Sequence, residues 1–289
     1  MPTNLQKTLV FITSLAAIFG LIFTQTQESI HSNHSAQTIS NSAPIATSSE
    51  SNTNAIEATI EPIAVVELFT SQGCSSCPPA DRVLRELIEE GKQTGKRIYG
   101  LSFHVDYWNY LGWKDPYSKT DFSDRQRHYN QHLKSRGSYT PQMIVNGVSE
   151  FVGSKREYAN QELAYALKTP AKIEIEITDL QLDKTKNQLQ FECQLTGDCK
   201  SCKVNIAAVE SNLKDAVKRG ENSGRTLQHD NVVRAFHTQG FEASDKVILD
   251  LPKGMDFEES AVIVYVQEGK YSRIVGAIGQ EFTADVNSR

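Results

Sequence analysis

The chain has 289 residues, a formal net charge of −5, and 39% hydrophobic and 22% charged residues. This composition is typical of a globular protein and argues against a largely disordered chain. The negative charge disfavours nucleic acid as a partner, since the sequence indicates no broad basic face. The locally basic stretch 125–136 is interpreted as a solvated helix face rather than an anion-binding patch.

The first residues predict export. Lys7 precedes an apolar run from Leu9 to Phe23, which has the length of a signal-peptide core and is short for a membrane-spanning helix. No clean small-x-small cleavage site follows directly, so residues 1–23 are expected to be a signal peptide or an uncleaved anchor. The rest of the chain is then periplasmic or extracellular, with a membrane tether through residues 9–23 if the anchor is kept.

Residues 24–61 are rich in Ser, Thr, Asn and Gln and nearly lack large apolar side chains. Such a stretch cannot bury enough surface to offset the entropy of ordering, so we expect a disordered linker. The folded part is expected to begin near Pro62 and to extend to about Phe282. That length suits one large domain or two small ones.

Short apolar runs alternate with helical patterns in residues 62–169. The run "IAVVELFT" is typical of a strand buried on both faces, and Pro78 begins a helix expected to end near Gly91. A second strand, a second helix, a hairpin around Asn146-Gly147 and a third helix follow. The predicted order β-α-β-α-β-β-α indicates a small three-layer α/β domain.

The pattern changes from residue 170. The stretches "KIEIEITDLQL" and "NQLQFECQLTG" alternate polar and apolar residues, as half-buried antiparallel strands do. Turn residues separate five further candidate strands, namely "KVNIAAVES", "NVVRAFHTQGF", "DKVILDLP", "SAVIVYVQEG" and "RIVGAIGQEF". Residues 170–284 are therefore predicted to form an antiparallel, β-rich, sandwich-like domain.

Cys74 and Cys77, in "FTSQGCSSCPPAD", lie between the first predicted strand and the first predicted helix. Three residues apart at a helix start, they share one face within disulfide reach. A helix N-terminus stabilises an anion, so a thiolate is expected to form readily at Cys74, with Cys77 as the resolving thiol. If the Thr140-Pro141 bond before the third strand is cis, the Thr140 backbone lies beside the sulfurs and can pair with an extended substrate.

The element order, the Cys-x-x-Cys after the first strand and the Thr-Pro before the third together resemble the thioredoxin fold. This resemblance implies that Cys74 attacks, that Cys77 resolves and that Pro141 is the cis-proline of a substrate groove. The chain also resembles the exported bacterial family known as domain of unknown function 1223, over about residues 63–282. The stretches that carry this second resemblance are "VELFTSQGCSSCPPAD", "SFHVDYWNYLGWKDPYS", "YTPQMIVNG" and "GENSGRTLQHDNVVR".

Both resemblances imply the same fold class. We expect an α/β thioredoxin-like domain over residues 62–169, followed by the antiparallel β-rich, sandwich-like domain over residues 170–284. The family's name implies no substrate.

Two further stretches carry candidate supporting residues. His104 and Asp106 follow the second strand at the sheet edge of Cys74, where His104 can shuttle a proton and either side chain can tune the thiolate. The alternative is that both satisfy backbone groups or pair with each other. Arg225 and His229, in "ENSGRTLQHDNVVR", belong either to the active-site cleft or to a domain-docking loop. No metal site is predicted, because the two histidines lack a tight ligand spacing.

Cys199 and Cys202 form a second close pair. They stand far from Cys77 in the sequence and in a different predicted domain, unlike the pairs of a structural zinc site. Disulfides persist in exported proteins, so a structural disulfide at a hairpin turn is predicted, with a second redox pair as the alternative. Cys193 lies on an alternating strand and is predicted to be a buried free thiol, although connectivity does not follow from sequence.

Thiol–disulfide exchange is the predicted activity. Cys74 would attack a disulfide to form a mixed disulfide that Cys77 resolves, with a protein thiol or disulfide as partner and no cofactor. One alternative is a non-catalytic ligand- or protein-binding module in which Cys74–Cys77 is structural. Another is a chaperone for a soft metal such as copper. The direction of exchange, the substrate and the oligomeric state do not follow from the sequence.

Overall fold

The computed structural model describes residues 59–282 of the chain. The predictions of a signal peptide or anchor, and of a linker up to residue 58, lie outside the described residues. Within residues 59–282, no helix combines the length and the apolar character that crossing a bilayer requires.

Three α-helices and a larger number of strands make up the described residues. The helices are α1 (Pro78–Thr94), α2 (Thr120–His132) and α3 (Arg156–Ala166), with short 3-10 turns η1 (Asn109–Leu111) and η2 (Phe257–Glu259). The first strands are β1 (Ile63–Thr70), β2 (Arg97–His104), β3 (Gln142–Val145) and β4 (Ser149–Val152). The later strands are β5 (Glu174–Asp183), β6 (Gln188–Thr196), β7 (Cys202–Glu210), β8 (Leu213–Ala216), β9 (Thr226–His229), β10 (Val232–Gly240), β11 (Ser244–Asp250), β12 (Ser260–Glu268) and β13 (Ile274–Glu281).

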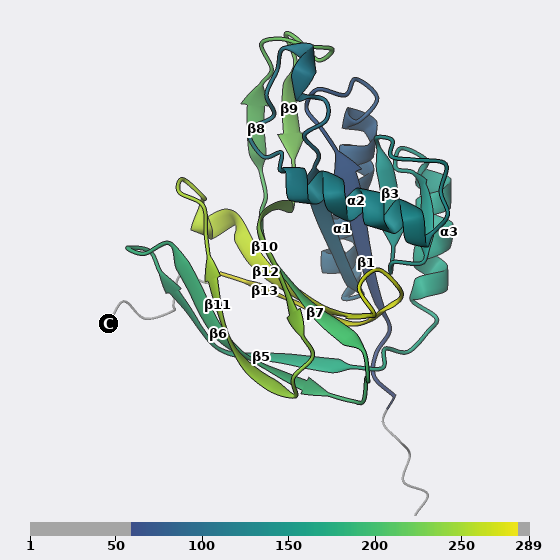
Figure 1. The fold of residues 1–289 in the computed structure, drawn as a ribbon, viewed down its shortest axis with the longest axis vertical. Helices are drawn as coiled ribbons and strands as arrows, with labels where there is room; N and C mark the ends of the chain where they lie inside the picture. Colours follow the sequence, from purple (N-terminus) through teal and green to yellow (C-terminus); the bar gives the residue numbers. More distant parts are fainter. Residues whose placement is uncertain (1–58, 283–289) are drawn as a thin grey trace, which may run out of the picture. The chain divides into compact units, whose positions relative to one another are not determined.

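Eight strands from both halves of the chain form one mixed sheet (Figure 1), in the order β13-β12-β7-β10-β2-β1-β3-β4. β1 and β2 are parallel, and β3 pairs antiparallel with β1. The junction between the halves is the parallel contact of β10 with β2. There the Ser102 N–H donates to the Asn231 carbonyl at 2.9 Å, and Asn231 Nδ2 donates to the Gly100 carbonyl at 2.9 Å.

The predicted fold class is wrong. The sequence predicts a thioredoxin-like α/β domain followed by a β-rich domain with its own sheets, whereas four strands of the second half continue the sheet of the first. Alternation of apolar and polar residues reports which face of a strand is buried but not which strand lies beside it, so the shared sheet was missed. The boundary placed between residues 169 and 170 stays a prediction.

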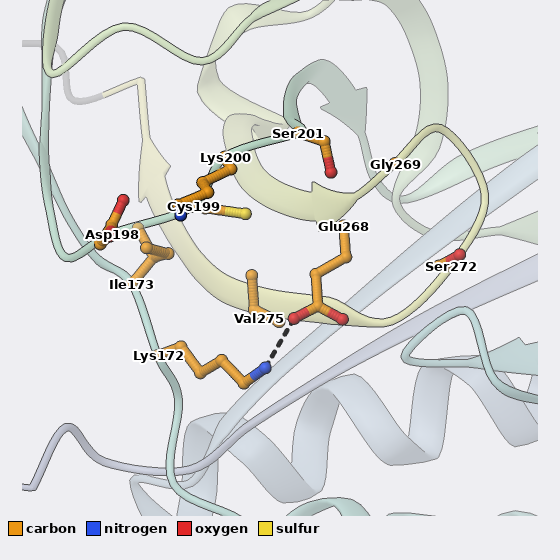
Figure 2. Close-up of a pocket in the computed structure, with 10 residues that line it drawn as sticks. All are labelled: Lys172, Ile173, Asp198, Cys199, Lys200, Ser201, Glu268, Gly269, Ser272 and Val275. Carbon is orange, nitrogen blue, oxygen red and sulfur yellow. Dashed lines mark hydrogen bonds and ion pairs between the residues drawn. The ribbon is translucent and has the colours of Figure 1, made fainter.

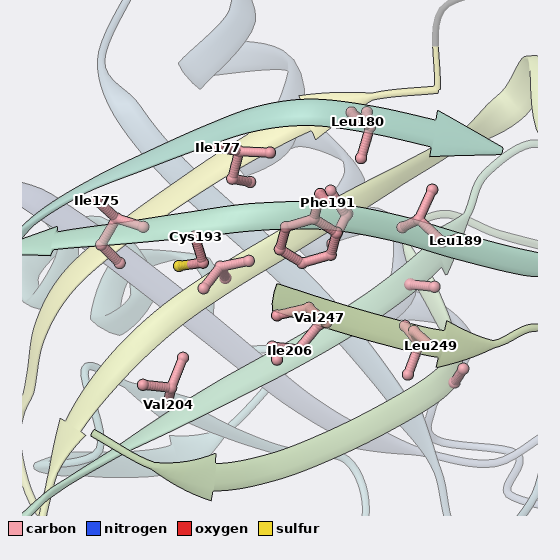
Figure 3. Packing of buried hydrophobic residues seen from close by; sticks show 14 of the residues in the cluster. Ile175, Ile177, Leu180, Leu189, Phe191, Cys193, Val204, Ile206, Val247 and Leu249 are labelled. Atoms are coloured by element: carbon pink, nitrogen blue, oxygen red, sulfur yellow. The ribbon is translucent and has the colours of Figure 1, made fainter. Parts of the chain in front are cut away.

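A second, three-stranded sheet with the order β11-β6-β5 packs on the part of the large sheet that contains β7, β10, β12 and β13. Side chains from both layers, including Phe191 and Ile206, form the buried cluster between them (Figure 3). Cys193 belongs to this cluster and carries no disulfide, which confirms its prediction as a buried free thiol. Burial, with a smaller contribution from nearby Asp245, raises the pKa of Cys193 to about 11.

The two faces of β1 are both covered, as its near-continuous apolar run predicts. Ala64 and Val66 point to one face, where α1 and α3 pack. Val65 and Phe69 point to the other face, where α2 and side chains of the later strands pack. The first half of the chain therefore depends on the second half for part of its core.

Glu67 is the exception in the apolar run of β1, and it is fully buried. Its Oε1 accepts hydrogen bonds from Arg125 Nη2 on α2 at 2.7 Å and from the Tyr265 hydroxyl on β12 at 2.6 Å. Arg125 on α2 thus compensates the charge of Glu67, and Tyr265 on β12 donates a hydrogen bond to the same carboxylate oxygen. The buried pair connects three elements that are distant in the sequence.

One sequence prediction about local structure is wrong, and two short strands were not predicted. α1 continues past Gly91 and ends at Thr94, with Gly95 in the left-handed region at φ +68°. Gly91 instead allows close packing, since a Cβ there would lie 3.0 Å from the Ile98 Cβ. The short strands β8 and β9, which pair only with each other, were not predicted as strands. Their segments are too short for a periodic signal.

Candidate functional site

Cys74 and Cys77 form a disulfide where the chain passes from β1 into α1, with their Cα atoms 5.5 Å apart. Pro78 follows at the first position of α1, where a missing N–H leaves no hydrogen bond unmade. Both cysteines are fully buried, whereas Ser75 and Ser76 between them are exposed. The prediction that the two cysteines lie within disulfide distance is confirmed, but their sulfurs are not exposed to solvent.

The Thr140–Pro141 bond is cis and lies beside this segment. The Ser76 hydroxyl donates to the Thr140 carbonyl at 3.5 Å, and the same hydroxyl lies 3.3 Å from Cys74 Sγ. Trp108 Nε1 donates to Thr140 Oγ1 at 2.8 Å. The main chain at Thr140 is therefore held next to the segment that carries the disulfide.

Residues 217–225, which connect β8 to β9, cover the disulfide segment; we name them the cover loop. The Asn222 side chain is fully buried, and its Nδ2 donates to the Gln72 and Cys74 carbonyls, each at 2.9 Å. Arg225 Nη1 in turn donates to Asn222 Oδ1 at 3.2 Å. The two carbonyls on either side of Gly73 are thus occupied by one amide of the cover loop.

A second contact of the cover loop involves its neighbouring carboxylate. The Ser75 N–H donates to Glu221 Oε2 at 3.0 Å. Hydrogen bonding from Ser75 holds the pKa of Glu221 below its usual value. The cover loop therefore contacts the main chain before and after Cys74, at Gln72, Cys74 and Ser75.

His104, at the end of β2, is buried beside the disulfide segment. Its Nδ1 lies 2.8 Å from Asp115 Oδ2, and the same oxygen accepts the Gln72 N–H at 2.8 Å. Asp115 Oδ1 accepts the Tyr117 N–H at 3.0 Å. Burial would raise the pKa of Asp115, but attraction and hydrogen bonding by His104 and by these N–H groups lower it. Asp115 is thus held as a buried carboxylate.

His229, on β9, lies against His104, with ring centroids 4.7 Å apart and an angle of 81° between the ring planes. Its Nδ1 is 3.5 Å from Asp81 Oδ2, which is ion-pair distance without hydrogen-bond geometry. Its Nε2 is 3.4 Å from Gln72 Nε2. Asp81 also accepts a hydrogen bond from the Thr70 hydroxyl at 2.9 Å. The two histidines, from β2 and β9, thus share one buried cluster.

Carboxylates control the charge of His229. Burial lowers its pKa, but contact with Asp81 and attraction by Asp115 and Asp215 outweigh burial and raise it. Its neighbour His104 has a buried Nε2 that finds no hydrogen-bond partner within residues 59–282. Both histidines of the cluster therefore lie close to carboxylates, and His104 Nε2 and His229 Nδ1 have no hydrogen-bond partner within residues 59–282.

Gln72 connects this cluster to β8. Its Nε2 donates to Asp215 Oδ2 at 2.9 Å, and its Oε1 accepts from Trp113 Nε1 at 2.9 Å. The Tyr117 hydroxyl donates to the same Asp215 oxygen at 2.7 Å. Burial, and then Asp215, raise the pKa of Tyr117. The hairpin that carries the cover loop is thereby held against the residues that precede the disulfide.

Residues 65–267 match the family described as "Protein of unknown function (DUF1223)". The chain belongs to the DUF1223 family. No curated protein matches the chain. The family match, which covers most of the described residues, establishes kinship and names no activity.

Solved structures similar to the DUF1223 chain include a structural-genomics target from Agrobacterium tumefaciens. It is 28% identical with a TM-score of 0.59, and the alignment covers 79% of this chain and 99% of that one. HBP35 of Porphyromonas gingivalis is 15% identical with a TM-score of 0.57, over 77% of this chain and 76% of that one. The latter likeness shows the fold alone.

The DUF1223 structure brings most of the predicted site residues into one region. Asp106 lies apart from the histidine cluster and does not pair with His104. It accepts hydrogen bonds from the Thr120 hydroxyl at 2.6 Å and from the Ser123 hydroxyl at 2.5 Å, at the start of α2. Burial would raise the pKa of Asp106, but these hydroxyls lower it. The predicted members near the disulfide are Thr140, Pro141, His104, Arg225 and His229.

Several residues of the site were missed by sequence reasoning. Gln72, Asp81 and Asp115 make the contacts that hold the cluster together, yet single polar residues beside a buried strand produce no periodic or spacing signal. The available hint is that Gln72 and Asp81 lie inside the stretch "FTSQGCSSCPPAD" itself. Polar residues that are buried must find partners, and here they find them in one another.

Cys199 and Cys202 form the second disulfide, at the turn between β6 and β7, with Cα atoms 5.7 Å apart. This confirms the predicted disulfide, while its structural role stays a prediction. Cys199 is half-buried on the wall of a surface cavity of about 500 Å³ (Figure 2). Lys172 and Glu268 line the same cavity, and Lys172 Nζ pairs with Glu268 Oε1 at 2.6 Å.

Within residues 59–282, no group of three or more His, Cys, Asp or Glu side chains is arranged to hold a metal ion. His104 and His229 contact each other through their rings, with centroids 4.7 Å apart.

Proposed function

We propose that this DUF1223 protein is an exported thiol–disulfide oxidoreductase that acts through Cys74 and Cys77. The observation that carries the proposal is a disulfide immediately before α1, next to the carbonyl of Thr140 from a separate segment. After reduction, the helix N-terminus would stabilise a thiolate at this position. The carbonyl of Thr140 would offer a main-chain partner to an extended substrate. Export rests on the apolar run of residues 9–23.

The exchange steps balance in electrons and protons. Starting from the reduced protein, the Cys74 thiolate attacks one sulfur of a substrate disulfide, and the other substrate sulfur leaves as a thiolate that takes a proton. The Cys77 thiolate then attacks Cys74 Sγ and releases the first substrate sulfur as a thiol. The protein ends as the Cys74–Cys77 disulfide and has delivered two electrons. A dithiol partner protein reduces it again by the reverse steps.

The buried sulfurs set a condition on this function. Because both cysteines are fully buried, a thiol or disulfide can reach them only after a local opening, and we assign this opening to the cover loop because it contacts the disulfide segment. The contacts to break are two hydrogen bonds from Asn222 and one to Glu221. Each such bond contributes about 1 kcal/mol net, so opening is energetically accessible without unfolding.

Reduction of insulin by dithiothreitol, followed by turbidity, tests the proposal. The wild-type protein should accelerate the reaction and Cys74→Ser should not, while a matched control, Cys199→Ser/Cys202→Ser, should keep the activity. Cys77→Ser should accumulate a mixed disulfide through Cys74, detectable by mass spectrometry. If wild type and Cys74→Ser behave alike, and glutathione fails to open Cys74–Cys77, the oxidoreductase proposal is wrong.

A binding module with a structural disulfide is the second candidate. The complete burial of Cys74 and Cys77 under Asn222 favours it, since structural disulfides are commonly shielded. It predicts that Cys74→Ser/Cys77→Ser loses stability but keeps whatever the protein binds. Nothing in residues 59–282 specifically favours the third alternative, a soft-metal chaperone.

A further inference from the structure

A cavity of about 430 Å³ lies between α1 and the start of β9. It begins at Pro78, the residue that follows Cys77, and three arginines line it: Arg82 and Arg85 from α1, and Arg225 from the end of the cover loop. We propose that this cavity is a binding subsite for a carboxylate of a peptide substrate. The identity of the ligand as a substrate rests on the proposed function, whereas the binding itself does not.

Two of the three arginines have charges that the protein does not neutralise. Arg85 pairs with Asp230, and its Nη2 donates to the Gln228 carbonyl at 3.2 Å. Arg82 and Arg225 are exposed, and neither has an ion-pair partner among residues 59–282. They approach one cavity from different elements. A planar guanidinium matches the two oxygens of a carboxylate, so the pair is suited to such a group.

The acidic groups near the cavity are already engaged. Asp81 lines it but is only 5% exposed, and its carboxylate faces the Thr70 hydroxyl and His229. Asp230 is taken by Arg85. Glu221 does not line the cavity, and its carboxylate accepts the Ser75 N–H. The accessible charge of the cavity is therefore positive.

The cavity is connected to the disulfide through two hydrogen bonds. Arg225 donates to Asn222 Oδ1 at 3.2 Å, and Asn222 donates to the Cys74 carbonyl at 2.9 Å. A carboxylate bound to Arg225 competes with Asn222 for the guanidinium. The hydrogen bond from Arg225 to the Asn222 side chain is then weakened, and this side chain is the one that donates to the Cys74 carbonyl. Binding of the carboxylate therefore favours the open form of the cover loop.

The size of the cavity restricts the ligand. Ligand pockets of about 300–1,000 Å³ hold small molecules or a few residues of a chain, and this cavity lies at the lower end. The partners of a thiol–disulfide exchange protein are thiol- or disulfide-bearing peptides, whose common anionic groups are carboxylates. The source is either a tripeptide thiol of the glutathione type or an acidic segment of a protein.

Binding of unreactive probes tests the subsite separately from redox activity. S-methylglutathione and an acetylated Glu-Glu-Ser-Glu amide supply the same carboxylate chemistry without a thiol, and calorimetry at low salt measures their affinity. Arg82→Gln and Arg225→Gln should each weaken binding by about tenfold, in line with the loss of a charge-assisted hydrogen bond. The matched control is Arg273→Gln, a half-buried arginine that lines a different cavity.

The outcomes separate the two proposals. If neither probe binds, or if Arg273→Gln weakens binding as much as Arg82→Gln, the subsite proposal is overturned whatever the insulin assay shows. If a probe binds through the arginines but insulin reduction does not depend on Cys74, the subsite stands and the proposed function fails. Binding of the tripeptide alone identifies a small thiol as the source, and binding of the acidic peptide alone identifies a protein segment. Unchanged melting temperatures of the variants confirm that they fold.

Discussion

His229 is a buried histidine surrounded by carboxylates, and this arrangement gives the protein a pH-dependent contribution to stability. The raised pKa in the folded state means that folding favours the protonated form. Its stabilising contribution is fully present below the ordinary pKa of a histidine, about 6.5, and is lost as the pH rises through the folded value. The contribution of Asp115 to stability depends on pH in the opposite sense. Because its pKa is lowered in the folded state, that contribution is lost only in acid.

Replacing His229 by Gln should therefore destabilise the protein most at acidic pH. We expect the difference in free energy of unfolding between wild type and His229→Gln to be largest at about pH 5.5 and to shrink toward about pH 9. Urea unfolding at a series of pH values measures it, and this range stays above the titration of Asp115. The control His237→Gln removes an exposed histidine and should show no such trend. A difference that is flat or grows with pH would contradict the assignment.

The hairpin of β8 and β9 contacts the disulfide segment and would have to move for the proposed exchange. Its loop places Asn222 over two carbonyls of the disulfide segment, while Gln72 and Asp215 hold its first strand. The loop is attached by a few hydrogen bonds rather than by a large apolar contact. Such segments open locally at a cost well below that of global unfolding.

Asn222→Ala should make the Cys74–Cys77 bond easier to reduce. Loss of two hydrogen bonds is expected to raise its rate of reduction by dithiothreitol about tenfold, since each contributes about 0.5–1.5 kcal/mol. Alkylation and peptide mass spectrometry follow the rate, and the Cys199–Cys202 bond in the same molecule should be unaffected. Ser223 lies in the same loop, and its hydroxyl donates to the Lys218 carbonyl rather than to the disulfide segment, so Ser223→Ala should behave as wild type. Equal rates in Asn222→Ala and wild type would show that the loop does not limit access.

Both halves of the described chain contribute strands to the eight-stranded sheet, and a buried ion pair connects strands of the two halves. Arg125 on α2 contacts Glu67 on β1 and Tyr265 on β12, so it touches strands from both halves of the chain. Burial would lower the pKa of Arg125, but attraction by Glu67 and the nearby tyrosines raises it, so the guanidinium stays charged. Removing one partner of such a pair leaves an uncompensated buried charge.

Glu67→Gln should destabilise the whole molecule by about 3–5 kcal/mol, because Arg125 would lose its compensating charge. We expect a lower urea midpoint with one cooperative transition, since the halves share a sheet. The control Lys92→Ala breaks an exposed ion pair with Glu281 and should change stability by no more than about 1 kcal/mol. Two separate transitions in the wild type would mean that the halves fold independently despite the shared sheet.

Local patterns were sufficient for the elements that surround the disulfide. The apolar run of β1, the proline at the start of α1 and the Asn146-Gly147 turn were all read correctly, because each depends on neighbours in the chain. The disulfide between Cys74 and Cys77 follows in the same way from their spacing. The end of α1 was misplaced because Gly91 serves packing against β2 rather than termination.

By itself, the amino-acid sequence determined the family, the spacing that allows a Cys74–Cys77 disulfide, and most individual strands and helices, since these depend on motifs and short-range periodicity. The tertiary structure alone decided that β10 continues the sheet at β2, that His104 pairs with Asp115, and that Asn222 covers Cys74. Asn222 and Cys74 stand 148 positions apart, and no pattern within either segment specifies the other. Contacts between distant segments are selected by the mutual burial and hydrogen bonding of the folded chain, and these become defined only when all the elements have packed together.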